Sequence, residues 1–234
     1  MQLGILENDK LYLEYCPDVG GSIFKFQAKV KDNKIDIFRG FKKKKIGKYS
    51  SYFSGYFSTV PYFGVIRKQS LFYKNKYISL KRTHPLEPDT IHGEGWVNNW
   101  EVVNRNKSNV SLKFFHNGKK SFPYKYETIQ KFRLIKNCLE IKVSIKNKDQ
   151  KSFDCGIGFH PWFNLNINSR IFSNTYKYVE IDKNNKIKIK YVELGFRALN
   201  NNKIKGSTAY TTDDFLQSLR IPKSLNIGVM VNAS

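Results

Sequence analysis

Alternation of apolar and polar residues with a period of two constrains this chain more than any other feature of its sequence. Between residues 139 and 145, four apolar side chains alternate with Glu140, Lys142 and Ser144. The segment 187–191 alternates in the same way with lysines. Because successive side chains of a β-strand point to opposite faces, this pattern predicts strands that bury one face and expose the other.

Short polar segments separate these apolar runs and predict turns, since they are rich in Asn, Asp and Lys. Further strands are predicted at 11–15, 110–114 and 225–232, and signals for helices are scarce. The sequence shows no internal repeat of the kind found in propellers or solenoids, and no linker rich in Pro or Ser. We therefore expect residues 1–234 to form a single all-β domain, a β-sandwich.

The composition is that of a folded domain from a reducing compartment. Hydrophobic residues make up 40% of the 234 residues and aromatic residues 15%, enough for a substantial core. The three cysteines cannot form a closed set of disulfides, and none lies in a CxxC pair. The first residues do not resemble a signal peptide, and no apolar stretch has membrane-spanning length. We expect a cytoplasmic protein with no membrane partner.

The formal net charge of +22 is the feature that most favours a nucleic-acid partner. The lysines are nevertheless spread along the chain, and only residues 42–45 form a run. We interpret that run as a solvated loop in preference to a phosphate-binding patch. The sequence therefore predicts no nucleic-acid partner, although the charge should raise the affinity for anions.

Two of the four histidines lie in segments rich in glycine and tryptophan. His92 lies in Ile-His-Gly-Glu-Gly-Trp, and His160 lies in Gly-Phe-His-Pro-Trp-Phe. Glycine lets the backbone come close to a ligand, and Pro161 restricts His160 to an extended conformation. Both histidines are therefore candidates for a functional role, and for each one taken alone a structural role is the alternative.

The other two histidines lack this context. His116 precedes Asn117-Gly118, a hairpin-turn dipeptide, and is predicted to be a solvent-exposed strand end. His84 is predicted to lie in a loop. The chain contains no HExxH, Cys/His cluster, GxGxxG, P-loop or GxSxG motif. We therefore expect no metal, no cofactor and no serine or cysteine nucleophile.

Five segments in combination resemble the aldose 1-epimerase family. Residues 91–96 resemble its His-Gly segment, and residues 158–164 resemble its G-x-H-P-[YW]-F-N segment. Residues 60–67 resemble the stretch that supplies a substrate-binding arginine. Residues 17–23 resemble the early Gly-Gly turn, and residues 122–132 the F-P-[YF]…Q-x-[FY] strand pair. The resemblance implies a large antiparallel β-sandwich of the galactose mutarotase type.

The resemblance also implies an activity, the interconversion of the α and β anomers of an aldohexose, with a sugar phosphate as a variant substrate. In that reaction a base takes the proton of the C1 hydroxyl while a general acid protonates the ring oxygen, and the ring opens. His160 corresponds to the general acid, and His92 to the second histidine, which binds the sugar. Arg67 corresponds to the substrate-binding arginine, and Asp213, in preference to the adjacent Asp214, to the substrate-binding aspartate.

Two tryptophans adjoin these histidines in sequence. Trp96 and Trp162 are candidates to stack on the C–H face of the sugar, and packing in the core is the alternative for each.

The chain departs from the family pattern at the general base, a glutamate that lies close to the C-terminus in the family. No residue before the end at Ser234 aligns with it, so we expect the chain to lack the last strands of the fold. Glu94, beside His92, is interpreted as a surface charge rather than as a replacement base. A sugar-binding module without turnover is therefore the alternative function.

Overall fold

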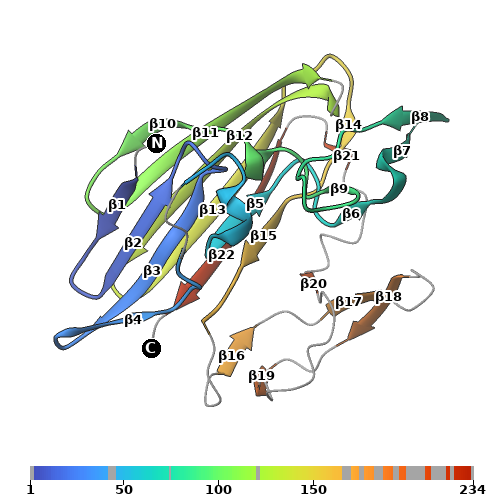
Figure 1. The fold of residues 1–234 in the computed structure, drawn as a ribbon. Helices are drawn as coiled ribbons and strands as arrows, with labels where there is room; N and C mark the ends of the chain where they lie inside the picture. Colours follow the sequence, from blue (N-terminus) through green and yellow to red (C-terminus); the bar gives the residue numbers. More distant parts are fainter. Residues whose placement is uncertain are drawn as a thin grey trace. The chain divides into compact units, whose positions relative to one another are not determined.

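The protein is an all-β molecule, as the alternating pattern predicted (Figure 1). The structure, a computed structural model, describes residues 3–41, 46–73, 75–119 and 122–164, and beyond these the backbone of seven strands. Its contacts divide into two compact units, Met1–Asn164 with Arg220–Ser234, and Leu165–Leu219. The described strands pair antiparallel throughout, which confirms the predicted fold class.

The first unit contains a six-stranded sheet in the order β1-β2-β3-β5-β15, with β4 also paired to β3. Along β2, Leu11, Leu13 and Tyr15 are buried, whereas Tyr12 and Glu14 are partly exposed. This alternation follows from the pleat of a strand that has one face in the core. The strands are β1 (Gly4–Glu7), β2 (Leu11–Cys16), β3 (Ser22–Val30), β4 (Asn33–Asp36), β5 (Tyr56–Thr59) and β15 (Gly158–Pro161).

The second sheet of this unit has five strands in the order β10-β11-β12-β13-β22. The apolar residues predicted to alternate between 139 and 145 lie on β13, and all four are buried. The predicted strands at 110–114 and 225–232 lie within β11 and β22. The strands are β10 (Glu101–Arg105), β11 (Asn109–Lys119), β12 (Phe122–Ile135), β13 (Cys138–Asn147) and β22 (Ser224–Asn232).

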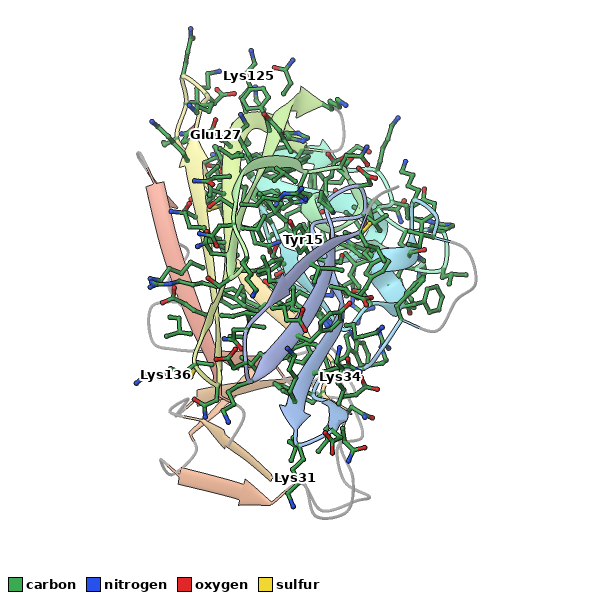
Figure 2. All side chains as sticks on the ribbon, turned by 90° about the vertical axis from the view of Figure 1, so that its left-hand side faces the viewer. Tyr15, Lys31, Lys34, Lys125, Glu127 and Lys136 are labelled. Carbon is green, nitrogen blue, oxygen red and sulfur yellow. The ribbon has the colours of Figure 1, made fainter. Side chains whose placement is uncertain are left out.

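Aromatic side chains fill the layer between the two sheets. The ring of Phe132, on β12, lies 6.3 Å from that of Tyr15 and 5.8 Å from that of Tyr56. Figure 2 shows Tyr15 inside this layer, whereas Lys31 and Lys136 lie at turns at the ends of strands. The core therefore forms by face-to-face packing of two antiparallel sheets.

A buried glutamine joins the two sheets by hydrogen bonds. Gln130, on β12, donates from Nε2 to the carbonyl oxygen of Gly21 at 2.7 Å. The hydroxyl of Tyr56 donates to Gln130 Oε1 at 3.3 Å. Gly21 has φ +56, and a Cβ there would meet Gln130 Nε2 at 2.9 Å. The close approach of the turn to the opposite sheet therefore depends on a glycine at this position.

The remaining elements are short. Strand β18 contains the predicted segment 187–191. Among the described residues the helices are 3-10 turns of three or four residues, so none has the length that crossing a bilayer requires. The remaining short strands and 3-10 turns of the first unit are η1 (Ser50–Phe53), β6 (Val65–Ile66), η2 (Arg67–Gln69), β7 (Ser70–Tyr73), β8 (Lys76–Ser79), β9 (Thr90–Ile91), η3 (Gly95–Val97), β14 (Phe153–Asp154) and β21 (Arg220–Ile221). In the second unit they are β16 (Arg170–Ser173), β17 (Lys177–Ile181), β18 (Ile187–Tyr191), β19 (Gly195–Ala198) and β20 (Ala209–Thr211).

The prediction that His116 is a solvent-exposed strand end is wrong. Its side chain is only 2% exposed, because β11 continues through Asn117 and Gly118 to Lys119. The Asn-Gly pair forms an irregularity in the register of β11 with β12 instead of the turn. The run 42–45, which we interpreted as a solvated loop, lies outside the described residues.

Replacing Gln130 by Met tests the hydrogen-bonded link between the sheets. Met is similar in length but leaves the Gly21 carbonyl and the Tyr56 hydroxyl buried without their partner, which should lower the free energy of unfolding by about 1–3 kcal/mol. Urea denaturation measures this loss. Thr128→Val is the matched control on the same buried face of β12, because the Thr128 hydroxyl has no hydrogen-bond partner among the described residues. Equal effects of the two substitutions would show that the link contributes nothing specific.

Candidate active site

The two histidines singled out in the sequence lie against each other in the first unit. His160 lies on β15, and His92 follows β9 in a loop. Their ring centroids are 5.0 Å apart, and the rings are nearly perpendicular at 74°. His160 is paired with Phe57 of β5, in the extended conformation that the following proline predicted. Segments almost 70 residues apart in the chain thus bring two imidazoles together.

An aromatic stack supports the pair from one side. The ring of Phe57 stacks on His160 at 4.6 Å and on Trp96 at 5.0 Å, so that it lies between them. Trp96 is 1% exposed, and its Nε1 donates to the carbonyl oxygens of Ile91 and Gly93. These contacts correspond to the core-packing alternative for Trp96. Phe57 is a site residue that the sequence analysis missed, since nothing in its local sequence distinguishes it from other strand residues.

Backbone geometry fixes the loop that carries His92. His92 has φ +59 and Gly93 has φ +68, two successive residues in the left-handed region. The N–H groups of Glu94 and Gly95 both donate to the carbonyl oxygen of Val60, at 3.0 and 3.1 Å. A Cβ at Gly93 would overlap that same oxygen. The left-handed conformation of His92, which is unfavourable for a residue with a Cβ, is therefore held by contacts around a required glycine.

A backbone donor also fixes the tautomer of His92. The N–H of Gly64 donates to His92 Nδ1 at 3.1 Å, and the N–H of His92 donates to the carbonyl oxygen of Gly64 at 3.0 Å. Because Nδ1 accepts a hydrogen bond, the neutral ring carries its proton on Nε2. His92 is therefore arranged as a neutral hydrogen-bond donor through Nε2.

Trp162 also contacts His160, with ring centroids 5.3 Å apart. It is 43% exposed, which leaves much of the indole accessible to a ligand. The guanidinium of Arg39 covers the Trp162 ring at 4.3 Å from its centroid. Arg39 is a second site residue that the sequence analysis missed, because its segment carries no motif.

Of the predicted substrate-binding residues beyond the tryptophans, the structure describes only Arg67. Arg67 begins η2 directly after β6, and β6 pairs with β9, which leads into His92. Its side chain is 58% exposed and approaches Asp89 at 3.9 Å between Nη1 and Oδ2. The two-stranded sheet of β6 and β9 thus places Arg67 and His92 directly after its two strands. Asp213 lies outside the described residues.

The interpretation of Glu94 as a surface charge is wrong. Its side chain is 16% exposed, and its Oε2 lies 2.9 Å from Nδ1 of the buried His116. The other ring nitrogen of His116, Nε2, lies 2.7 Å from the carbonyl oxygen of Phe122. Glu94 therefore participates in a buried pair that connects the loop after His92 to β11. In the described ranges, no group of three or more His, Cys, Asp or Glu side chains is arranged to hold a metal ion.

The environment of the histidine pair disfavours positive charge. Burial and, as the smaller cause, the neighbouring His160 together lower the pKa of His92 to about 3. Burial also lowers the pKa of His160 to about 4, and the positive charge of Arg39 acts in the same direction. Both imidazoles are therefore neutral at pH 7 in the absence of a ligand.

The chain is similar in sequence to one family and to one curated protein. The model of the aldose 1-epimerase family matches residues 5–208. The uncharacterized protein YphB of Escherichia coli (strain K12) is 27% identical over 110 residues, an alignment that covers 44% of this chain and 37% of YphB.

Solved structures show the same fold. A putative aldose 1-epimerase from Escherichia coli K12 superposes with a TM-score of 0.66 at 21% identity, over 87% of this chain and 64% of that one. A galactose mutarotase-like protein from Clostridium acetobutylicum superposes with a TM-score of 0.63 at 18% identity, over 78% and 59%. The chain thus spans less than two thirds of the length of these relatives.

The lowered pKa values predict that acid destabilises the fold through the histidine pair. Below a pH of about 6.5 the two histidines bind protons in the unfolded chain but stay neutral in the folded site. Their contribution to the free energy of unfolding is therefore fully present above that pH and decreases as the pH falls toward about 4. Urea midpoints measured between pH 8 and pH 4.5 should therefore decrease. His92→Asn removes one of the two groups with a residue that tolerates positive φ, and its curve should be flatter. Parallel curves for the two proteins would contradict this origin of the pH dependence.

Proposed function

Since the chain belongs to the aldose 1-epimerase family, we propose that it interconverts the α and β anomers of an aldohexose by acid/base ring opening, with His160 as the general acid. The observation that carries the proposal is the placement of His92 and His160 with their rings 5.0 Å apart beside a partly exposed indole. Opening a sugar ring requires proton-transferring and hydrogen-bonding groups around one acetal centre, and two adjacent imidazoles can supply them.

The two histidines have different tasks in this proposal. His160 delivers a proton to the ring oxygen, which becomes the C5 hydroxyl when the C1–O5 bond breaks, while the C1 hydroxyl passes its proton to water and C1 becomes the aldehyde carbon. His92 donates a hydrogen bond from Nε2 to the sugar, since its Nδ1 is already engaged by the Gly64 N–H. A neutral donor stabilises developing negative charge on an oxygen without adding a second positive charge beside His160.

The sugar-binding roles rest on exposure and donor geometry. Trp162, with its accessible indole, stacks on the C–H face of the sugar, and the guanidinium of Arg67 donates to its hydroxyls. Asp213 is assigned to the same task on its resemblance to the family aspartate alone. Trp96 has no direct contact with the sugar in this proposal, because it is buried beneath Phe57.

A sugar-binding protein without anomer exchange is the second candidate function. It is favoured by the engagement of Glu94, the carboxylate closest in sequence to His92, with the buried His116. A protein that lacked a base to take the C1 hydroxyl proton would still bind the sugar but exchange its anomers more slowly by about two to four orders of magnitude.

We also propose a cytoplasmic location. The three cysteines are free in the structure, and Cys16 is buried, which suits a reducing compartment.

Anomer exchange of glucose and galactose, followed by polarimetry or by exchange NMR, tests the enzyme function. The wild-type protein should accelerate exchange above the spontaneous rate, and His160→Asn should lower that acceleration by about 10²–10⁴-fold. Arg67→Ala should mainly raise KM, and Lys131→Ala, an exposed change on β12, should have no effect. Binding of sugar by calorimetry without any acceleration would establish the second candidate instead.

The pH dependence of kcat/KM tests the role of His160. A general acid must carry its proton, and the free protein has a pKa of about 4 at His160. The value of kcat/KM should therefore rise about tenfold per unit as the pH falls from 8 to 5, after subtraction of the spontaneous rate. A flat profile over this interval would show that His160 acts without prior protonation.

A further inference from the structure

Arg39 is held against the candidate site by hydrogen bonds to backbone carbonyls. Its Nη2 donates to the carbonyl oxygens of Tyr52, at 3.0 Å, and Ser54, at 2.7 Å, and its Nε donates to that of Ser54 at 3.2 Å. These bonds use two sides of the planar guanidinium and fix its orientation. The face of the group then lies over the Trp162 ring at 4.3 Å.

Arg39 and Trp162 are also joined by a hydrogen bond between their main chains. The N–H of Arg39 donates to the carbonyl oxygen of Trp162 at 2.6 Å, and the N–H of Trp162 donates to that of Gly55 at 2.8 Å. Trp162 is therefore held at its main chain by two hydrogen bonds and at its indole by the stacked guanidinium. Its ring in turn lies 5.3 Å from His160, at an interplanar angle of 31°.

The charge of Arg39 is not neutralised by these partners, since carbonyl oxygens carry no net charge. Arg39 takes part in none of the ion pairs found among the described residues. Its guanidinium is partly buried, which lowers its own pKa but leaves it charged. A fixed positive charge therefore lies next to the indole that adjoins His160.

We propose that Arg39 is a positioning residue of the candidate active site, whose guanidinium holds the Trp162 indole beside His160 and supplies a fixed positive charge to the environment of that histidine. The inference deepens the proposed function and rests on it only for the effect on turnover. No motif or comparison assigns Arg39 a role. Its two actions, stacking and charge, are separable by substitution.

Two groups that carry or can carry charge face His160 in the described structure, Arg39 and His92. His92 is neutral at pH 7, so Arg39 is the group that bears charge in this range. Both Arg39 and burial oppose the protonation of His160. Removing the charge should therefore raise the pKa of His160, although burial will still hold it below the ordinary value.

The experiment compares Arg39→Met, which removes the charge, with Arg39→Lys, which keeps the charge but cannot bind two carbonyls and stack at once. Two properties that do not depend on turnover are measured for each protein. NMR titration of the imidazole signals gives the midpoint of His160. Acrylamide quenching of fluorescence reports Trp162, because Trp96 and Trp100 are buried.

Arg39→Met should raise the His160 midpoint by about half a pH unit and increase the quenching of Trp162. Arg39→Lys should increase the quenching but leave the midpoint within about two tenths of a unit of wild type. Arg133→Met, which removes an exposed arginine of β12, is the control and should change neither quantity. Anomer exchange should fall about tenfold in Arg39→Lys, because this variant loses the position of the indole while the charge near His160 is kept.

Wild-type quenching in Arg39→Lys would overturn the stacking role, and this variant tests it even if Arg39→Met does not fold. A midpoint in Arg39→Met equal to that in Arg133→Met would overturn the charge role. Because both readouts are independent of turnover, they still decide the inference in a protein that exchanges no anomers. Failure of the proposed function is therefore distinguishable from failure of the positioning role proposed for Arg39.

Discussion

The pairing of β15 with β5 determines where the parts of the candidate site lie. It sets His160 opposite Phe57, and Phe57 in turn stacks on Trp96 at 5.0 Å. One residue beyond β15, the N–H of Trp162 reaches the carbonyl of Gly55, so the same two segments also place the indole. A shift of one residue in this register would turn His160 to the other face of the sheet. The chemistry proposed here thus depends on a ladder of four residue pairs.

Local sequence predicted the features whose cause is local. The alternation in 139–145 gave β13 with the correct buried face, and Pro161 gave the extended conformation of His160. The two histidine segments were recognisable because each combines a histidine with glycine and tryptophan at close spacing. That these segments meet could not be read from local signals, since it depends on the β5–β15 pairing and on the contact of the 93–95 loop with Val60.

The wrong predictions for His116 and Glu94, and the failure to identify Arg39, also arise from contacts between segments that are distant in the sequence. Asn117-Gly118 has the chemistry of a hairpin turn, but the pairing of β11 with β12 continues past it, and His116 is buried against Glu94 as a result. Glu94 likewise looks like a loop charge until its distant partner is known. Arg39 was missed because its role depends on carbonyls 13 and 15 residues away and on an indole still further along the chain.

The Phe57 ring that stacks on His160 is expected to stabilise the protonated form of this histidine. The two rings are 4.6 Å apart and almost parallel at 19°, so an imidazolium at this position lies over the face of a benzene ring. The negative electrostatic potential above that face attracts the cation by about 0.5–1 kcal/mol or more when water is excluded. The Phe57 ring therefore partly offsets the two effects that oppose protonation of His160, burial and the charge of Arg39. It does so without a carboxylate. Phe57, an uncharged side chain of the core, would thus stabilise the protonated form of His160 in the proposed reaction.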